Sequence, residues 1–244
     1  MGRVRQSRGK RGSACRLAVA ALAAAFLAGC AAPVQRQTPQ LQRVEGTPTI
    51  VVMPLDVELA ELTAGGLEEP RAEWTDAALK HMHAALEEEA KHYRVKLVDD
   101  RPERGSAQDR ETSLELQRLH RAVGGAVLVH RYFPGLGLPS KDEKFDWSLG
   151  PAVAAIARTQ DADYALFLFV RDRYASAGRV AVMVIGALLG VGVPGGAQVG
   201  FASVVDLKSG DIVWFNHLAR AAGDLRTPEA AAETVKALVS DSLK

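Results

Sequence analysis

The chain has 244 residues and a near-neutral charge, with 30 basic and 29 acidic side chains. Six of the basic groups lie before Leu17, so removal of a leader there would leave 24 basic against 29 acidic groups, a net charge of −5. Such a mildly acidic domain is a poor candidate for binding nucleic acid or an anionic bilayer surface. Only two cysteines are present, which leaves no scope for a disulfide framework or a thiolate metal site once Cys15 is removed.

The amino terminus has the pattern of a secretory signal. Residues 1–16 carry basic groups and no acid, and residues 17–29 are apolar without a charge. The cations would stay on the cytoplasmic side while the apolar stretch enters the bilayer. About 13 apolar residues are fewer than the ~20 that a spanning helix needs, so we predict a signal core in residues 1–29 and not a lasting anchor.

The apolar stretch ends in Leu27-Ala-Gly-Cys30. This sequence resembles the lipobox of bacterial lipoproteins residue for residue. The resemblance implies cleavage before Cys30, diacylglycerol on the Cys30 thiol, and acylation of the new amino terminus, for example with palmitate. An ordinary signal with a chance cysteine is the alternative. The residue after the cysteine is Ala31 and not an aspartate. In enterobacterial relatives, a residue other than aspartate at this position implies sorting to the outer membrane.

The mature chain divides into two regions by composition. Residues 30–46 are rich in proline and glutamine and have little to bury, so we predict a flexible, lipidated tether. About 16 residues would span roughly 20 Å as a coil and up to ~55 Å when stretched. Residues 47–244 are numerous enough for a real core and are predicted to form a single domain.

Hydrophobic patterning predicts an α/β domain with a mixed sheet of about five strands and helices packed on it. A second helix after Arg110 would pack through Leu116, Leu119, Val123 and Val127, with residues 127–133 as an alternative strand. The run 164–170 is apolar on both faces, so it should be the central strand. The predicted elements are, in order, strand 49–55, helix 71–93, strand 95–99, the helix after 110, helix 149–159, strands 164–170, 198–206 and 212–218, and helix 228–243.

This order of elements and several local phrases resemble a family of bacterial envelope lipoproteins. The family includes the curli secretion channel, the outer-membrane activators of penicillin-binding proteins, and the amino-terminal domain of the Tol-system β-propeller protein. The resemblance implies a mixed sheet, no catalytic centre, and work through protein contacts. This sequence departs from the family pattern in two places, which are the long loop at 142–147 and the very apolar segment 180–196. The matching phrases lie at 50–55, 93–99, 161–166 and 204–214.

Three features invite a chemical interpretation, and each has a simpler one. His81 and His83 would point about 200° apart on a helix, so they cannot grip one metal ion. His130 on the second helix is more typical of a hydrogen-bonded core histidine than of a ligand. Gly190-Val-Gly-Val-Pro-Gly195 fits a dinucleotide motif, but a proline lies inside it and a strand-like run follows it. We therefore predict no catalytic residues, no metal and no cofactor.

The uncharged segment 180–193 is too short for a spanning helix and lacks the alternation of a porin strand. Gly186 and Gly190 are four residues apart, a spacing that lets another helix approach closely, so they are candidate packing or assembly contacts. The segment has three interpretations. It is buried within the domain, it forms an exposed patch for a partner or for self-association, or it dips into the membrane.

Together these features predict a membrane-anchored envelope lipoprotein that faces the periplasm from the outer membrane. Its function would be that of a non-enzymatic interaction or assembly factor with an envelope protein partner. The alternative is an oligomeric subunit of an outer-membrane secretion channel. An enzyme is disfavoured because no motif supports it. Trp147, Trp214 and Phe215 are candidate contact residues, although core packing suits Trp214 better.

Overall fold

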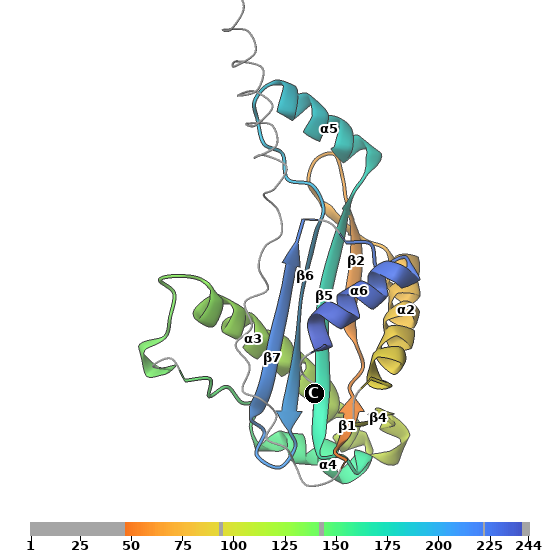
Figure 1. Ribbon diagram of the computed structural model, residues 1–244, viewed down its shortest axis with the longest axis vertical. Helices are drawn as coiled ribbons and strands as arrows, with labels where there is room; N and C mark the ends of the chain where they lie inside the picture. The colour runs from red at the N-terminus through yellow and green to blue at the C-terminus, as the bar shows by residue number, and fades with distance from the viewer. Residues whose placement is uncertain (1–46, 93–94, 142–143, 222, 241–244) are drawn as a thin grey trace, which may run out of the picture. The chain divides into compact units, whose positions relative to one another are not determined.

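The computed structural model describes residues 47–92, 95–141, 144–221 and 223–240 (Figure 1). All of them belong to one compact unit, Val34–Lys244. The predicted signal peptide, the lipidation site Cys30 and the tether up to Gly46 lie outside the described residues.

The sheet is built around one long strand, β5 (Tyr164–Ala175). On one edge β5 pairs in parallel first with β1 (Thr49–Val52) and then with β2 (Asp56–Leu62). On its other edge it pairs along ten residues with the antiparallel β6 (Ala197–Asp206). Because β5 has neighbours on both edges and helices over both faces, its side chains from 164 to 168 are all buried, as the continuous apolar run predicts.

Three further strands extend the sheet at its edges. β4 (Lys96–Asp99) lies parallel to β1, β3 (Glu68–Pro70) lies antiparallel to β2, and β7 (Ile212–Arg220) lies antiparallel to β6. The hairpin between β6 and β7 turns through Gly210, whose φ of +84° suits glycine. In front of the turn, Asp206 Oδ1 accepts hydrogen bonds from the backbone amides of Lys208 and Ser209.

The predicted mixed α/β fold is confirmed, and the described residues form a sheet of seven strands where about five were predicted. Pro54 separates β1 from β2, which are consecutive pieces of chain docked one after the other on β5. β2 has the alternating pattern of a strand, with Val57 and Leu59 buried and Glu58 exposed. β3 is acidic and fully exposed, so only its pairing with β2 makes it a strand.

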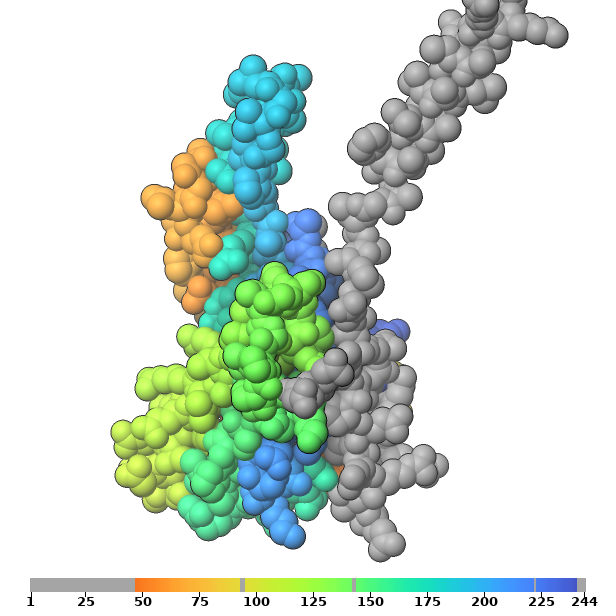
Figure 2. All heavy atoms as spheres, turned by 90° about the vertical axis from the view of Figure 1, so that its left-hand side faces the viewer, coloured from red at the N-terminus to blue at the C-terminus, as the bar shows by residue number. Residues whose placement is uncertain are grey.

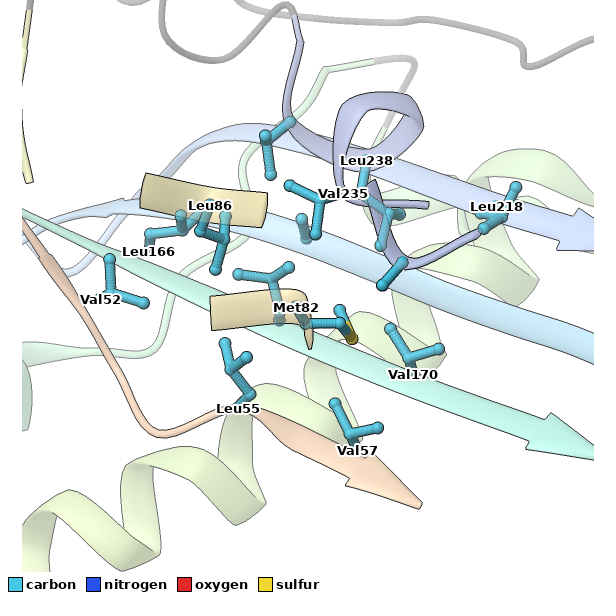
Figure 3. Close-up of a cluster of buried hydrophobic side chains, with 14 of the residues drawn as sticks. Val52, Leu55, Val57, Met82, Leu86, Leu166, Val170, Leu218, Val235 and Leu238 are labelled. Carbon is cyan, nitrogen blue, oxygen red and sulfur yellow. The ribbon is translucent and has the colours of Figure 1, made fainter. Parts of the chain in front are cut away.

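Helices α2 (Ala72–Ala90) and α6 (Pro228–Val239) cover one face of the sheet. Figure 3 shows Met82 and Leu86 of α2 lying over the sheet beside the side chains of α6. Each such buried side chain contributes ~2 kcal/mol through removal of apolar surface from water. α6 begins as its sequence predicts: the Thr227 hydroxyl accepts a hydrogen bond from the Ala230 amide, and Pro228 occupies the first turn.

Helices α3 (Ala107–Tyr132) and α4 (Ala154–Gln160) cover the opposite face. The prediction that Leu119 packs inward was wrong, because it is 40% exposed. Leu116 and Val127 are buried as predicted and Val123 is partly buried against the core, while His120 and Gly124 complete the buried stripe of α3. The alternative strand at 127–133 is also wrong, because α3 continues to Tyr132. Short 3-10 turns occupy Pro102–Arg104, Pro139–Lys141 and Pro151–Val153.

Candidate functional site: an exposed apolar arm

Helix α5 (Ala177–Leu188) leaves the end of β5, and the chain returns from it to β6. It projects beyond the end of the sheet in Figure 1, and Figure 2 shows it as an extension of the folded body. Its first turn is capped by the Ser176 hydroxyl, which accepts a hydrogen bond from the Arg179 amide at 3.1 Å. We call residues 177–193 the apolar arm.

The side chains of the apolar arm are exposed to an unusual degree for their type. Leu188 is 82% exposed and Leu189 is 74% exposed. The interpretation that this segment is buried within the domain is therefore wrong. Its apolar sequence indicated a core element, but the neighbouring chain covers only a small part of the helix. The other exposed large apolar side chains of the arm are Val180, Val182, Val184, Ile185 and Val191.

The two glycines at the end of α5 shape the turn that follows the helix. Gly190 has a φ of +72°, and its amide donates to the Ala187 carbonyl while the Val191 amide donates to the Gly186 carbonyl. These two bonds form a Schellman cap. Gly186 is buried, and a Cβ at this position would lie only 2.7 Å from Val193 Cγ2. Both residues thus have roles within the chain, and their part in assembly stays a prediction.

The base of the arm is held to the β2–β3 turn and to the chain that returns to β6. The Arg179 guanidinium donates to the carbonyl of Pro194 at 3.0 Å and to that of Ala64 at 3.4 Å. Leu67, on the same β2–β3 turn, is 73% exposed and adds to the apolar surface at this end of the sheet.

Arg179 donates to backbone carbonyls, whereas two other arginines close to the base lie in ion pairs. Arg173 and Glu68 form an ion pair at 2.6 Å. Arg71 pairs with Glu61 and also approaches Glu69. These pairs are partly exposed, so each adds little stability. They do, however, place an acidic partner beside each of these two arginines.

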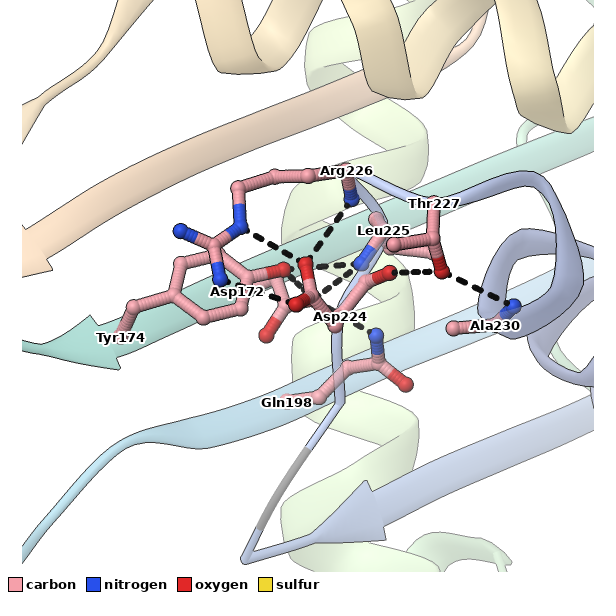
Figure 4. A network of polar contacts seen from close by, with 8 residues as sticks. All are labelled: Asp172, Tyr174, Gln198, Asp224, Leu225, Arg226, Thr227 and Ala230. Atoms are coloured by element: carbon pink, nitrogen blue, oxygen red, sulfur yellow. Dashed lines mark hydrogen bonds and ion pairs between the residues drawn. The ribbon is translucent and has the colours of Figure 1, made fainter.

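Just below the arm, a buried carboxylate ties the sheet to the segment before α6 (Figure 4). Asp172 Oδ2 accepts hydrogen bonds from the Tyr174 hydroxyl at 2.5 Å and from Gln198 Nε2 at 2.8 Å. The Leu225 amide donates to the Tyr174 hydroxyl oxygen at 2.8 Å, and more weakly to Asp172 Oδ2. Burial, followed by the hydrogen bond to Asp172, raises the pKa of Tyr174. This network fixes the end of β5 from which the arm emerges.

Arg226 covers this network from the outside. Its guanidinium lies 4.2 Å from the Tyr174 ring centre and 4.8 Å from that of Trp74. It also forms a two-pronged ion pair with Asp224, with distances of 2.7 and 2.8 Å. The hydrogen bond from Arg226 lowers the pKa of the Asp224 carboxyl. Arg226 therefore covers the network from the outside, through its contacts with the Tyr174 and Trp74 rings and its ion pair with Asp224.

A hollow of about 410 Å³ lies at the end of α3 and includes Trp147 in its lining. Lys141 Nζ lies 4.7 Å from the Trp147 ring centre and 3.0 Å from the Asp146 carboxylate. His130 also lines this hollow, and its Nδ1 is 2.8 Å from the Leu136 carbonyl oxygen. His130 is thus hydrogen-bonded as predicted, although it is only partly buried and not in the core.

The histidine that does lie in the core is His120, which sequence reasoning did not single out. It is 2% exposed, its Nε2 is 2.8 Å from Ser203 Oγ, and its ring stacks on Phe167. Burial lowers the pKa of His120 to about 3. The signal available in the sequence was its position one turn after Leu116 on an apolar face.

The other chemical motifs are not assembled into sites. His81 and His83 flank the buried Met82 on α2. Among the described residues, no three His, Cys, Asp or Glu side chains are grouped so as to hold a metal. The Gly190–Gly195 motif is followed by β6 and not by the helix that a dinucleotide site requires. Trp214 and Phe215 are each 1% exposed and belong to the core, so neither is available as a contact residue.

No helix within the described ranges has the length and apolarity needed to cross a membrane. No protein-family model matches the chain, and no curated protein matches it by sequence.

Several solved structures match most of the chain at low sequence identity. The PelC dodecamer from Paraburkholderia phytofirmans is 14% identical, with a TM-score of 0.38 over 87% of this chain and 100% of that one. The LpoB carboxy-terminal domain from Salmonella enterica is 16% identical, with a TM-score of 0.27 over 72% and 84%. Lipoprotein GNA1162 from Neisseria meningitidis is 12% identical, with a TM-score of 0.31 over 81% and 99%. At these TM-scores the likenesses do not extend to function.

Proposed function

We propose that the protein is a lipid-anchored component of the bacterial cell envelope that works by contact, as an interaction or assembly factor and not as an enzyme. The observation that carries this proposal is the apolar arm. A water-exposed helix with Leu188 and Leu189 at its end exposes apolar surface of the kind that marks contact with a protein or a membrane. The lipobox at Leu27–Cys30 supports the anchoring part of the proposal.

Two buried polar groups of the domain support the same proposal, because they hold elements of the fold together. Asp172 joins β5 to β6 and to the segment before α6. His120 joins α3 to β6 through Ser203. These groups are occupied by structural hydrogen bonds, as expected of a scaffold that presents a surface.

The anchoring is tested by replacing Cys30. In Cys30→Ser we expect the chain to remain uncleaved and unacylated, because the thiol that accepts the lipid is missing. The readout is the mass of the protein and its distribution between membrane and soluble fractions. Cys15→Ser is the matched control, since it makes the same chemical change inside the predicted signal. Normal processing and fractionation of the Cys30→Ser chain would remove the lipoprotein assignment.

The contact role is tested by photo-crosslinking from exposed positions in intact cells, followed by mass spectrometry. Leu114 on α3 and Phe133 after it are exposed and suit such a probe. Capture of one specific envelope component from either position would support an interaction factor, and absence of any adduct across the exposed surface would contradict it.

A second candidate function is an oligomeric subunit of an outer-membrane secretion channel. The exposed apolar arm favours this candidate, because the arms of several copies could pack together. Light scattering of the detergent-solubilised protein separates the two, because a channel must be a large oligomer.

A further inference from the structure

We propose that the apolar arm inserts into the near leaflet of a bilayer of zwitterionic phospholipid, as a second membrane contact beside the acylated Cys30. The inference rests on the proposed function in one respect: acylation of Cys30 holds a bilayer within reach. The affinity of the arm for lipid comes from the arm itself.

The exposed apolar side chains surround most of α5. At 100° per residue, the positions from Val180 through Val184 and Leu188 to Ile185, Leu189 and Val182 cover an arc of roughly 200°. All of these side chains are exposed. A helix that packs on one protein neighbour needs an apolar stripe of only about 100°, with polar groups on the opposite side. The remaining side of the helix carries Arg179 at its base and faces the returning chain at Val193. An exposed apolar arc this wide is matched by a medium that surrounds the helix, which is lipid.

The backbone at the far end of the arm suits an apolar medium. The amides of Leu189, Gly190 and Val191 all donate to carbonyls within α5, at 2.8 to 3.2 Å. The groups that a helix leaves unpaired at its carboxyl end are carbonyls, and each group left unpaired in hydrocarbon would cost several kcal/mol. The Schellman cap built on Gly190 pairs the carbonyls of Gly186 and Ala187 at the most exposed part of the arm.

Charge favours a neutral lipid surface over an anionic one. No Asp, Glu, Lys or Arg occurs between Arg179 and Asp206, so nothing charged would enter the bilayer with the arm. At the base, Arg173 is paired with Glu68, and Arg71 with two glutamates. Arg179, which donates to two backbone carbonyls, adds a single cation and not a cationic patch that would select anionic headgroups, so insertion should depend little on salt.

The length of the arm fits one leaflet. Twelve helical residues rise roughly 18 Å, compared with a hydrocarbon core of about 30 Å for the whole bilayer. Leu188 and Leu189, at the end of the helix, would then lie deepest, and Arg179 would remain near the headgroups.

The anchored end of the chain can reach the same bilayer. The described chain begins beside β1, whose Ile50 pairs with Tyr164 at the start of β5, whereas the arm follows the other end of β5. The twelve residues of β5 span roughly 40 Å. The segment from Cys30 to Gly46 can extend up to ~55 Å, so it covers this distance.

The test places a fluorophore at the end of the arm. In the mature acylated protein, Leu188→Cys introduces the one thiol available for labelling, because Cys15 is removed and Cys30 carries lipid. The labelled protein is reconstituted into phosphatidylcholine vesicles with phospholipids that carry a nitroxide quencher on the acyl chain. Leu114→Cys, an exposed leucine on α3, is the matched control. Leu189→Cys repeats the measurement at an independent position.

Insertion predicts that the fluorophores at 188 and 189 are quenched several-fold more than the one at 114, and that high salt does not change this. Equal quenching at all three positions would overturn the proposal. So would a blue shift at 188 that grows with protein density without quenching, since this indicates that arms bury each other in a second copy. A requirement for anionic lipid would also overturn it. Loss of acylation at Cys30 is detected separately, by mass and fractionation before labelling, and counts against the proposed function alone.

Discussion

Two neighbouring glycines on α3 have opposite environments. A Cβ at Gly124 would overlap the Phe201 ring of β6, whereas a Cβ at Gly125 would meet nothing within 4 Å. The close approach of α3 to the sheet therefore depends on one of the pair only.

We expect Gly124→Ala to lower the free energy of unfolding by about 2 kcal/mol, because overpacking outweighs the gain in helix propensity. Gly125→Ala should raise it by up to ~1 kcal/mol, because only the propensity changes. Urea denaturation of the two variants measures both values. Similar effects of the two substitutions would mean that α3 does not pack on Phe201 as described.

His120 makes the stability of the domain depend on pH. Its folded pKa of about 3 is below the ordinary value of 6.5, so the unfolded chain binds the proton more readily in that interval. The stabilising contribution is complete above the unfolded pKa and is lost as the pH falls towards 3. Between pH 7 and pH 5 the expected loss from this one group is about 2 kcal/mol.

In His120→Gln we expect a smaller fall in stability between pH 7 and pH 5 than in the unchanged protein, measured by denaturant unfolding at each pH. His83→Gln, at a half-buried position on α2, should keep the original slope. Some slope will remain in the His120 variant, because burial also lowers the pKa of His217. Parallel profiles for the unchanged protein and the His120 variant would contradict the assignment.

At the scale of elements, β5 is fixed by the polar network around Asp172. Replacement of this carboxylate removes the acceptor shared by the Tyr174 hydroxyl and the Gln198 amide. Because Gln198 is buried and Tyr174 partly so, we expect Asp172→Ala to lower the free energy of unfolding by about 3 kcal/mol. Thermal or urea unfolding measures the change. Asp211→Ala, at an exposed position beside the β6–β7 turn, should cost less than ~0.5 kcal/mol. If Asp172→Ala lowered the free energy of unfolding no more than Asp211→Ala does, the network around Asp172 would not stabilise the fold.

Elements were predictable where the pattern alone decides them. The continuous run at 164–170 predicts β5, and Thr227 with Pro228 predicts the start of α6, because propensity and capping act locally. β2 was missed although the alternation of Val57, Glu58 and Leu59 is a usable signal. β3 carries no such signal, because its acidic residues form a strand only through their pairing with β2.

The candidate site was predictable in composition but not in environment. The sequence singles out 180–193 as an uncharged apolar segment, and α5 lies there. Exposure depends on which elements lie beside a segment, and this is decided by the fold as a whole. The position of His120 one turn after Leu116 indicates a buried face, but its partners Ser203 and Phe167 could not be predicted, because they come from distant strands.

At the scale of the whole molecule, the arm interrupts a pair of adjacent strands. Arg173 near the end of β5 pairs with Ala197 at the start of β6, so a short turn would suffice to join them. The residues in between therefore form an excursion from a simple hairpin. Such an insertion is free to change in length and chemistry over evolution, because the register of the two strands does not depend on it. Relatives with the same sheet can then differ in what they touch while folding in the same way.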